Sequence, residues 1–347
     1  MSVDELYMHK CLTLAELGRS GAAPNPMVGA VLVHKNRIIG EGFHQKYGQA
    51  HAEVNCISAV EQNDVHLISE STLYVSLEPC AHYGKTPPCA NLIIDKKIAK
   101  VVIGCFDPFE EVAGRGIEKL RSAGTDVTTG ILENECRELN KRFFTFHTLH
   151  RPYIILKWAQ ASDSKIAKDN SRLAISNEYT NRIVHKWRSE EMAILVGTNT
   201  ALIDDPQLTT RLWPGKSPVR LVIDMDLKLP SSLRLFDGHS RTIVFNRIKQ
   251  EENENLFFCR LKVEMNLVSQ ILEVLYSLQI KSVLVEGGAK LLQSFIDAGL
   301  WDEARVITNE QMIIGEGVLA PVLQHHQFQS SEHVFSDIIQ TFKNKNI

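Results

Sequence analysis

The sequence alternates between segments with apolar residues at helical spacing and short apolar runs typical of buried strands. Leu6, Leu14 and Leu17 share one helical face, which predicts a helix over 4–17. A short polar segment joins 28–33 to 37–42, which predicts a β-hairpin. The same alternation predicts helices over 52–60, 90–95, 116–123 and 133 to about 146, and strands over 72–77 and 100–104. This order favours a three-layer α/β arrangement.

The second half continues the alternation without repeating the sequence of the first. It predicts strands over 153–158, 193–196, 219–223, 242–245, 282–285 and 304–308, and helices over 178–188, 266–278 and 289–298. Pro152 stands ahead of a new apolar strand, and 347 residues favour two domains rather than one. We therefore expect domains over residues 1–149 and 150–347. Nothing after Pro321 predicts an element.

The composition is that of a globular protein and disfavours several functional classes. Apolar residues make up 44% of the chain and charged residues 23%, both ordinary values for packed domains. The 38 basic and 41 acidic residues leave a net charge of −3, and neither half has the basic excess usual in nucleic-acid binding. No run of 18 apolar residues occurs, so we expect no membrane span.

Cysteine usage indicates a reducing compartment. Seven irregularly spaced cysteines do not resemble a secreted disulfide scaffold, and the N-terminus carries acidic residues where a signal peptide needs basic ones. We therefore expect a cytoplasmic protein. Apolar surroundings predict that five cysteines are buried free thiols, namely Cys11, Cys56, Cys105, Cys136 and Cys259.

The strongest chemical pattern combines His51-Ala52-Glu53 with Cys80 and Cys89. Zinc accepts imidazole nitrogen and thiolate sulfur, and three protein ligands leave a fourth tetrahedral position for water. Glu53 follows the histidine by two residues at a helix start, where its carboxylate can move protons without ligating the metal. These residues therefore predict a catalytic zinc site, with His51, Cys80 and Cys89 as ligands and Glu53 as the acid and base.

A plainer interpretation makes His51, Cys80 and Cys89 buried residues that never meet. Against it, H-x-E followed by P-C-x-x-C is the general signature of zinc deaminases, which this sequence departs from only in its longer C-x8-C spacing. A structural zinc module would instead need four protein ligands.

The insert from Cys80 to Cys89, with the segments 23–29 and 107–116, resembles the bifunctional riboflavin-biosynthesis deaminase/reductase family. The resemblance implies a cytidine-deaminase-like three-layer first domain. It also implies that Asn25 and His82 face a pyrimidine and that Lys85 and Thr86 hold its ribose phosphate. Asp107 matches a substrate contact, although Asp-Pro-Phe-Glu replaces the usual Asp-Pro-Asn-Pro.

The second half lacks the G-x-G-x-x-G turn of a dinucleotide-binding Rossmann fold after its first strand. It has Gly287-Gly288 between a strand and a helix, a turn that lets a ligand approach the backbone. Segments 157–167 and 197–211 extend the family resemblance here and imply a dihydrofolate-reductase-like α/β domain. By that resemblance the NADPH site comprises Ala159, Thr200, Asp204, Gly288, Ala289, Lys290, Leu291, Leu292, Gln293 and Ser294.

The resemblance further implies that Lys157 and Glu286 lie near the reacting end of the substrate, with Arg188, Leu208 and Arg211 as further contacts. An arginine fork suits a phosphate group. The stretch before the 178–188 helix is one residue shorter than in the family and lacks its usual Trp. There Ser171 matches a substrate contact, and we expect Ser176 to cap the helix.

The resemblance thus implies two successive reactions. The first is zinc-dependent hydrolytic deamination of 2,5-diamino-6-ribosylamino-4(3H)-pyrimidinone 5′-phosphate, with one zinc ion per chain. The second is NADPH-dependent reduction of the ribosyl group of the resulting uracil to a ribityl chain. We expect a homo-oligomer, either a dimer or a tetramer, that binds no nucleic acid. The alternative is a zinc deaminase of another free base or of nucleic acid, with a non-catalytic C-terminal domain.

Overall fold

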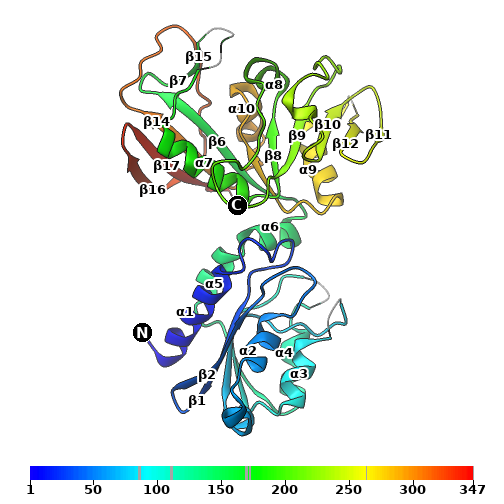
Figure 1. The fold of residues 1–347 in the computed structure, drawn as a ribbon, viewed down its shortest axis with the longest axis vertical. Helices are drawn as coiled ribbons and strands as arrows, with labels where there is room; N and C mark the ends of the chain where they lie inside the picture. Colours follow the sequence, from blue (N-terminus) through cyan, green and yellow to red (C-terminus); the bar gives the residue numbers. More distant parts are fainter. Residues whose placement is uncertain (85–86, 110–111, 169–170, 172, 263, 347) are drawn as a thin grey trace. The chain divides into compact units, whose positions relative to one another are not determined.

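The computed structural model describes residues 1–84, 87–109, 112–168, 171, 173–262 and 264–346. The chain divides into two compact units, Met1–His150 and Arg151–Ile347. Figure 1 shows both as mixed helix and strand structures.

The first unit is built on a five-stranded sheet in the order β2-β1-β3-β4-β5. The strands are β1 (Gly29–His34), β2 (Arg37–Phe43), β3 (Thr72–Leu77), β4 (Lys100–Cys105) and β5 (Asp126–Thr129). The predicted hairpin pairs β1 with β2, and β1 also runs antiparallel to β3. Strands β3, β4 and β5 are parallel, so their carboxyl ends meet at one edge of the sheet.

Helices cover both faces of this sheet, which makes the three layers visible in Figure 1. One face buries Leu73 and Val75 against α2 (Ala52–Ser58), α3 (Cys89–Asp95) and α4 (Arg115–Ser122). The other face buries Tyr74 and Val102 against α1 (Val3–Glu16), α5 (Glu133–Leu139) and α6 (Lys141–Leu149). Successive residues of β3 therefore serve opposite cores, as strand geometry requires. A 3₁₀ segment, η1 (Gln62–Glu70), precedes β3.

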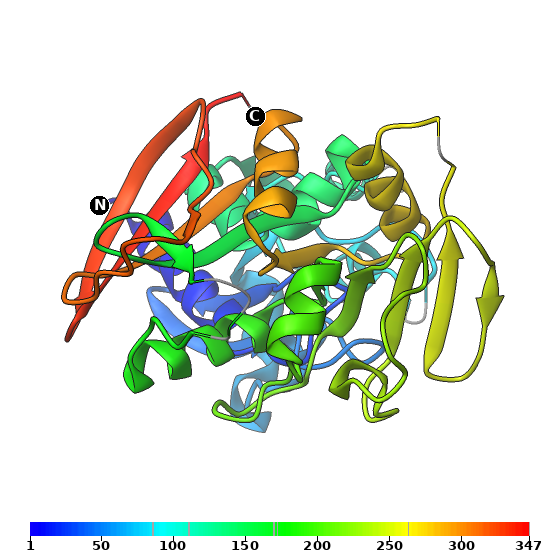
Figure 2. The same ribbon diagram turned by 90° about the horizontal axis from the view of Figure 1, so that it is seen from above.

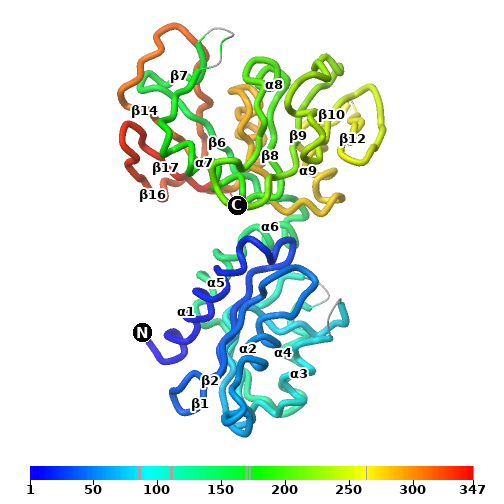
Figure 3. The backbone as a smooth tube through the Cα atoms, in the orientation of Figure 1, coloured from blue at the N-terminus to red at the C-terminus, as the bar shows by residue number. Residues whose placement is uncertain are grey.

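The prediction of one helix from 133 to about 146 is wrong, because the backbone breaks at Asn140 between α5 and α6 (Figure 3). The Asn140 side chain accepts the N–H of Met27 and donates to its carbonyl, both at 2.8 Å. These two bonds join the break to the start of β1. A distant backbone partner thus decides where the helix is interrupted.

The second unit contains a ten-stranded sheet in the order β11-β12-β10-β9-β8-β13-β6-β14-β17-β16. Its strands are β6 (Tyr153–Ala161), β8 (Ala193–Val196), β9 (Val219–Ile223), β10 (Thr242–Asn246), β11 (Glu251–Glu252), β12 (Leu256–Arg260), β13 (Ser282–Val285), β14 (Glu303–Asn309), β16 (His326–Val334) and β17 (Asp337–Asn344). In this spatial order, neighbouring strands from β12 through to β14 are parallel. At one end β11 pairs antiparallel with β12, and at the other β14 pairs antiparallel with β17 and β17 with β16. Figure 2 shows these ends on opposite sides of the unit.

Both faces of this sheet are also covered. One core packs α9 (Leu267–Ser277) and α10 (Ala289–Asp297) onto the parallel strands. The other contains residues of α7 (Glu178–Glu190), α8 (Thr198–Asp204) and the 3₁₀ turn η2 (Arg234–Phe236). A small separate sheet pairs β7 (Lys165–Ala167) with β15 (Val318–Leu319).

Two further expectations for this unit need correction. Ser176 does not cap α7; the Asn177 side chain does, accepting the N–H groups of Tyr179 and Thr180 at 3.0 Å each. The segment after Pro321 is not featureless, since it forms the β16–β17 hairpin at the sheet edge. None of the helices among the described residues combines the length and apolar character needed to cross a bilayer.

A buried ion pair anchors the start of the second unit. The Asp302 carboxylate accepts two hydrogen bonds from the Arg151 guanidinium, at 2.7 and 2.8 Å, and a third from the N–H of Ile154 at 2.7 Å. Both side chains are at least nine-tenths buried. The pair therefore joins a residue two positions before β6 to the residue directly before β14.

We predict that Arg151→Met lowers the free energy of unfolding of this unit by about 3–5 kcal/mol, because it leaves a buried carboxylate without its cation. All four tryptophans lie after residue 150, so their fluorescence during urea unfolding follows this unit alone. Arg247→Met is the matched control, because Arg247 pairs with Asp226 at the surface and should contribute less than about 1 kcal/mol. Equal losses in the two variants would contradict the anchoring role.

Candidate zinc centre and reductase site

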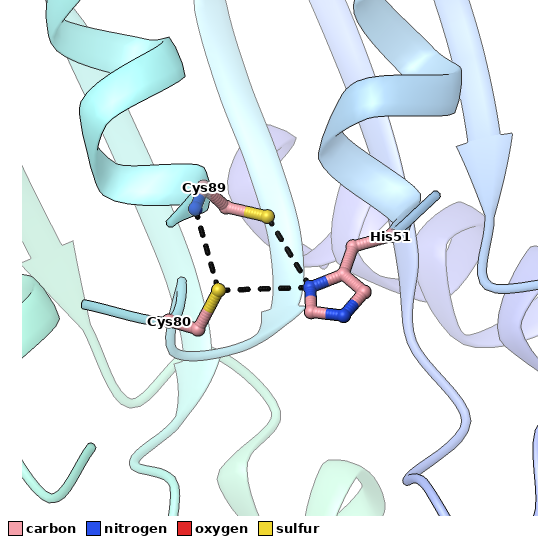
Figure 4. Close-up of side chains that lie close together, drawn as sticks. All are labelled: His51, Cys80 and Cys89. Carbon is pink, nitrogen blue, oxygen red and sulfur yellow. Dashed lines mark hydrogen bonds between the residues drawn. The ribbon is translucent and has the colours of Figure 1, made fainter. Parts of the chain in front are cut away.

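Three side chains from separate elements of the first unit converge on one point (Figure 4). His51 immediately precedes α2, Cys80 follows β3, and Cys89 opens α3. Nδ1 of His51 lies 3.6 Å from Sγ of Cys80 and 3.4 Å from Sγ of Cys89. In a tetrahedral zinc site, with bonds of about 2.1 Å to nitrogen and about 2.3 Å to sulfur, these ligands stand roughly 3.6 Å apart. The three residues therefore fit zinc, with a fourth position left for water.

The local structure favours anionic sulfur at this point. The backbone N–H of Cys89, at the start of α3, donates to Sγ of Cys80 at 3.3 Å. A hydrogen bond from the Cys89 thiol lowers the pKa of Cys80 to about 4, and the same bond together with burial raises the pKa of Cys89. A divalent cation bound between the two sulfurs would favour the thiolate form of both.

Glu53 lies in the first turn of α2 and is only 3% exposed. Burial raises its pKa to about 7, and the neighbouring Cys80 sulfur adds to the shift. A carboxyl group with such a pKa can take up and release a proton near neutral pH, as general acid–base catalysis requires. The geometry therefore suits Glu53 to proton transfer beside the metal ligands.

A histidine that the sequence did not single out links Asn25 to this centre. Nδ2 of Asn25 lies 3.2 Å from Nε2 of His44, whose other ring nitrogen lies 3.1 Å from the Ala50 carbonyl. The rings of His44 and His51 meet edge-on, with centroids 5.3 Å apart. Burial lowers the pKa of His44, which favours its neutral form. Through His44, Asn25 is thus linked to His51, one of the three candidate zinc ligands.

The other substrate contacts that the resemblance implies for the first domain are His82, Asp107, Lys85 and Thr86. The His82 ring meets the Phe109 ring edge-on at 5.8 Å, and Nδ1 of His82 is buried without a hydrogen-bond partner among the described residues. Asp107 is buried, and its carboxylate accepts the N–H of Phe109 at 2.8 Å. Lys85 and Thr86, the expected phosphate contacts, lie outside the described residues.

In the second unit, charged residues gather at the carboxyl end of β13. Glu286 accepts two hydrogen bonds from Arg188, at 2.8 and 2.7 Å, and Nζ of Lys157 lies 3.9 Å from its carboxylate. Burial alone would raise the pKa of Glu286, but Arg188 and Lys157 outweigh it and lower the pKa to about 2. Burial in turn lowers the pKa of Lys157 against the pull of Glu286. The cluster therefore holds one carboxylate against two basic side chains in a preorganised arrangement.

The segment that carries Leu208 and Arg211 passes beside this cluster. Nη1 of Arg188 donates to the Thr209 carbonyl at 3.4 Å. Arg211 is exposed, whereas the Leu208 side chain packs in the hydrophobic core. His185, one turn before Arg188, is buried; burial and then the charges of Arg188 and Arg211 lower its pKa to about 4. The positive charges of Arg188 and Arg211 thus both lower the pKa of His185.

The Gly287-Gly288 turn packs closely against the turn between β8 and α8. The N–H of Gly288 donates to the Thr200 hydroxyl at 2.9 Å. A Cβ at Gly287 would come within 2.6 Å of the Leu291 side chain and 3.0 Å of the Gly197 nitrogen. Only glycine fits there without displacing the neighbouring turn.

The remaining residues expected at the NADPH site have mixed surroundings. Leu291 and Leu292 point into the core, whereas Lys290 is exposed and Ala289, Gln293 and Ser294 are half-buried. Ala159 on β6 and Asp204 at the end of α8 are also half-buried. Ser171 is exposed, and its hydroxyl donates to the Lys168 carbonyl at 2.9 Å.

Comparisons with known proteins cover both units. Residues 1–105 match the cytidine and deoxycytidylate deaminase zinc-binding region, and residues 152–343 match the RibD C-terminal domain. The riboflavin biosynthesis protein RibD of Aquifex aeolicus is 41% identical over 91% of this chain and 89% of its own. RibD of Bacillus amyloliquefaciens is 38% identical over 96% and 91%. The chain belongs to the RibD family.

Solved structures agree with this assignment. A diaminohydroxyphosphoribosylaminopyrimidine deaminase/5-amino-6-(5-phosphoribosylamino)uracil reductase of Thermotoga maritima superposes with a TM-score of 0.88, at 36% identity and with 98% of each chain covered. RibD of Acinetobacter baumannii gives 0.87 at 29% identity, again over 98% of each chain.

These findings confirm several predictions from the sequence. The chain combines a cytidine-deaminase-like first domain with a dihydrofolate-reductase-like second domain, and it is a bifunctional riboflavin-biosynthesis enzyme. The alternative with a non-catalytic C-terminal domain is not favoured, because that domain matches the family's own reductase. The zinc-binding match spans His51, Cys80 and Cys89.

We predict that purified protein holds about one zinc per chain, bound by these three residues. Cys80→Ser should lose most of the metal, because a serine hydroxyl does not ionise at neutral pH. Cys259→Ser, a buried cysteine of the second unit, is the matched control and should keep it. Metal analysis of the dialysed proteins checks this, and undiminished zinc in Cys80→Ser would rule out the site.

Proposed function

We propose that the first domain, residues 1–149, hydrolytically deaminates 2,5-diamino-6-ribosylamino-4(3H)-pyrimidinone 5′-phosphate. The second, residues 150–347, would then reduce the ribosyl group of the resulting 5-amino-6-(5-phosphoribosylamino)uracil with NADPH. The observation that carries the first assignment is the meeting of His51, Cys80 and Cys89 beside the buried Glu53. The relatives named above support the substrate and the order of the two reactions.

In the first reaction, Glu53 moves the protons. Zinc, when bound by the three ligands, supplies Lewis-acid activation of a water molecule. Glu53 would accept a proton from the attacking water, whose oxygen forms a bond to the amino-bearing carbon, and would return a proton to the amino group, so that the C–N bond breaks and ammonia leaves. A pKa of about 7 lets one carboxyl group perform both transfers. Asn25, held by His44, and His82 orient the pyrimidine ring.

In the second reaction, the charge cluster orients the sugar phosphate. NADPH, when bound, would supply the hydride, a proton taken from solvent would complete the reduction, and the turn at Gly288 and Thr200 would hold the cofactor. Two N–H donors of the Arg188 guanidinium are already bound to Glu286. We therefore assign the phosphate contact chiefly to Arg211, and we assign Arg188 the role of holding Glu286 in place. Lys157 and Glu286 then face the ribosyl carbon that accepts the hydride.

We also propose that the protein is a cytoplasmic homo-oligomer, either a dimer or a tetramer. Support for the compartment comes from the cysteines, all seven of which are free. Free thiols on this scale are typical of a reducing environment.

Because the two reactions are assigned to separate domains, we predict that Glu53→Gln loses deamination and keeps the reductase activity. The amide keeps the size of the side chain but cannot carry protons, so the deamination rate should fall by roughly 10² or more. Supplied with the deaminated substrate, the same variant should oxidise NADPH at close to the wild-type rate. Ammonia release and NADPH absorbance measure the two steps separately. Loss of NADPH oxidation on the deaminated substrate by a folded variant would show that the sites are not independent.

The phosphate assignment predicts that Arg211→Ala weakens binding of the phosphorylated substrate by about 2 kcal/mol, as expected when a charged hydrogen bond is lost. This corresponds to a roughly thirtyfold higher KM for the reductase, with little change in NADPH affinity. Arg241→Ala is the control, because Arg241 pairs with Glu252 at the surface. Equal reductase KM values of the wild type for the phosphorylated and dephosphorylated substrates would contradict the assigned phosphate contact.

A further inference from the structure

Glu78 is a buried carboxylate to which the reaction described above assigns no role. It lies between β3 and the ligand Cys80, and it is 3% exposed. Its Oε1 atom accepts the N–H groups of Gly116 at 2.9 Å and Ile117 at 3.3 Å. Its Oε2 atom accepts those of Gly114 at 3.0 Å and Asp107 at 3.3 Å. Four backbone donors thus satisfy a carboxylate that has no cation in contact with it among the described residues.

These donors belong to the two ends of one segment. Asp107 follows β4, whereas Gly114, Gly116 and Ile117 form the start of α4, where the helix has no side-chain cap of its own. The start of α4 also packs tightly, because a Cβ at Gly116 would come within 2.0 Å of the Pro79 carbonyl oxygen. Glu78 therefore fastens both ends of the segment to the loop that carries Cys80.

The fastened segment contacts His82, which is proposed above to orient the pyrimidine, through the ring of Phe109. The Asp107 carboxylate accepts the N–H of Phe109, and the Phe109 ring meets the rings of His82 at 5.8 Å and His147 at 5.1 Å. Phe109 stands where the family usually has an asparagine. In this chain an aromatic ring, rather than an amide, lies against the His82 ring.

We propose that Glu78 is a positioning residue for deamination, holding Asp107 and Phe109 against the Cys80 loop so that His82 faces the pyrimidine. The proposal rests on the deamination proposed above. A carboxylate suits this task because it offers four lone-pair sites and favours a helix N-terminus. Binding of the pyrimidine therefore depends on a residue that need not contact it.

The test compares Glu78→Gln with Glu78→Asp in the zinc-loaded full-length enzyme. Glutamine keeps the shape but turns donor hydrogens toward the backbone donors, so we expect the deaminase KM to rise by roughly tenfold or more while kcat changes less. Aspartate keeps the charge and should restore part of the loss. Glu133→Gln, an exposed carboxylate that pairs with Arg137, is the control and should match the wild type.

A purely structural role would give a different result. If Glu78→Gln loses zinc in proportion to its activity, or keeps the wild-type KM, the proposal is overturned. Reduction of the deaminated substrate in the same samples reports the amount of intact second domain. If the wild type itself releases no ammonia from the diamino substrate, the proposed function fails instead, and the two failures are distinguishable.

A second variant keeps the proposal testable if Glu78→Gln does not fold. Phe109→Leu removes the ring beside His82 and leaves the four bonds of Glu78 in place. It should raise the KM in the same direction, by roughly three- to tenfold, with zinc content and thermal unfolding close to wild type. An unchanged KM in this variant would show that the segment does not position His82.

Discussion

A carboxylate taken out of water must find hydrogen-bond donors or opposite charges, and this requirement organises both domains of the chain. Glu78 gathers four backbone N–H groups in the first domain, and Asp302 takes Arg151 and a backbone N–H in the second. Each bond joins segments far apart in the sequence. Glu78 thus holds the Cys80 loop against the start of α4, and Asp302 holds the starts of β6 and β14 together.

The same burial produces opposite chemistry at Glu53 and Glu286. Both are buried acids, yet the pKa of Glu53 rises to about 7 while that of Glu286 falls to about 2. The difference lies in their neighbours, because Glu53 stands beside a sulfur that carries negative charge, whereas Glu286 stands between Arg188 and Lys157. A carboxyl group poised near neutrality suits proton transfer, and a permanently ionised one suits orientation of a polar substrate. One fold class thus serves hydrolysis in one domain and reduction in the other.

The sequence predicted features that depend on local pattern. The hairpin of β1 and β2, the alternation of helices and strands in both domains and the spacing of His51, Cys80 and Cys89 all follow from periodicity or from ligand chemistry. The five cysteines outside the centre are buried free thiols, as their apolar surroundings predicted. Such features need no knowledge of which distant segments meet.

Features that depend on distant partners could not be predicted. Asn140 breaks a helix because Met27 pairs with its amide, and the β16–β17 hairpin exists because β14 offers it an edge. The pairing of Arg188 with Glu286 joins residues 98 positions apart, so a pattern that suggested a phosphate-binding arginine could not show that its fork was occupied. For Glu78, the only signal was an acidic residue directly after an apolar strand, which does not reveal four donors from another loop.

If two independent sites act in series on one substrate, the order of their products shows it most directly. The measurement follows ammonia release and NADPH oxidation together while the wild-type enzyme acts on the diamino substrate in the presence of NADPH. Ammonia should appear first, NADPH oxidation should follow after a lag, and the two should finish at about one to one. Oxidation of NADPH without prior ammonia release would contradict the order, and ammonia release with no later oxidation would contradict the role of the second domain.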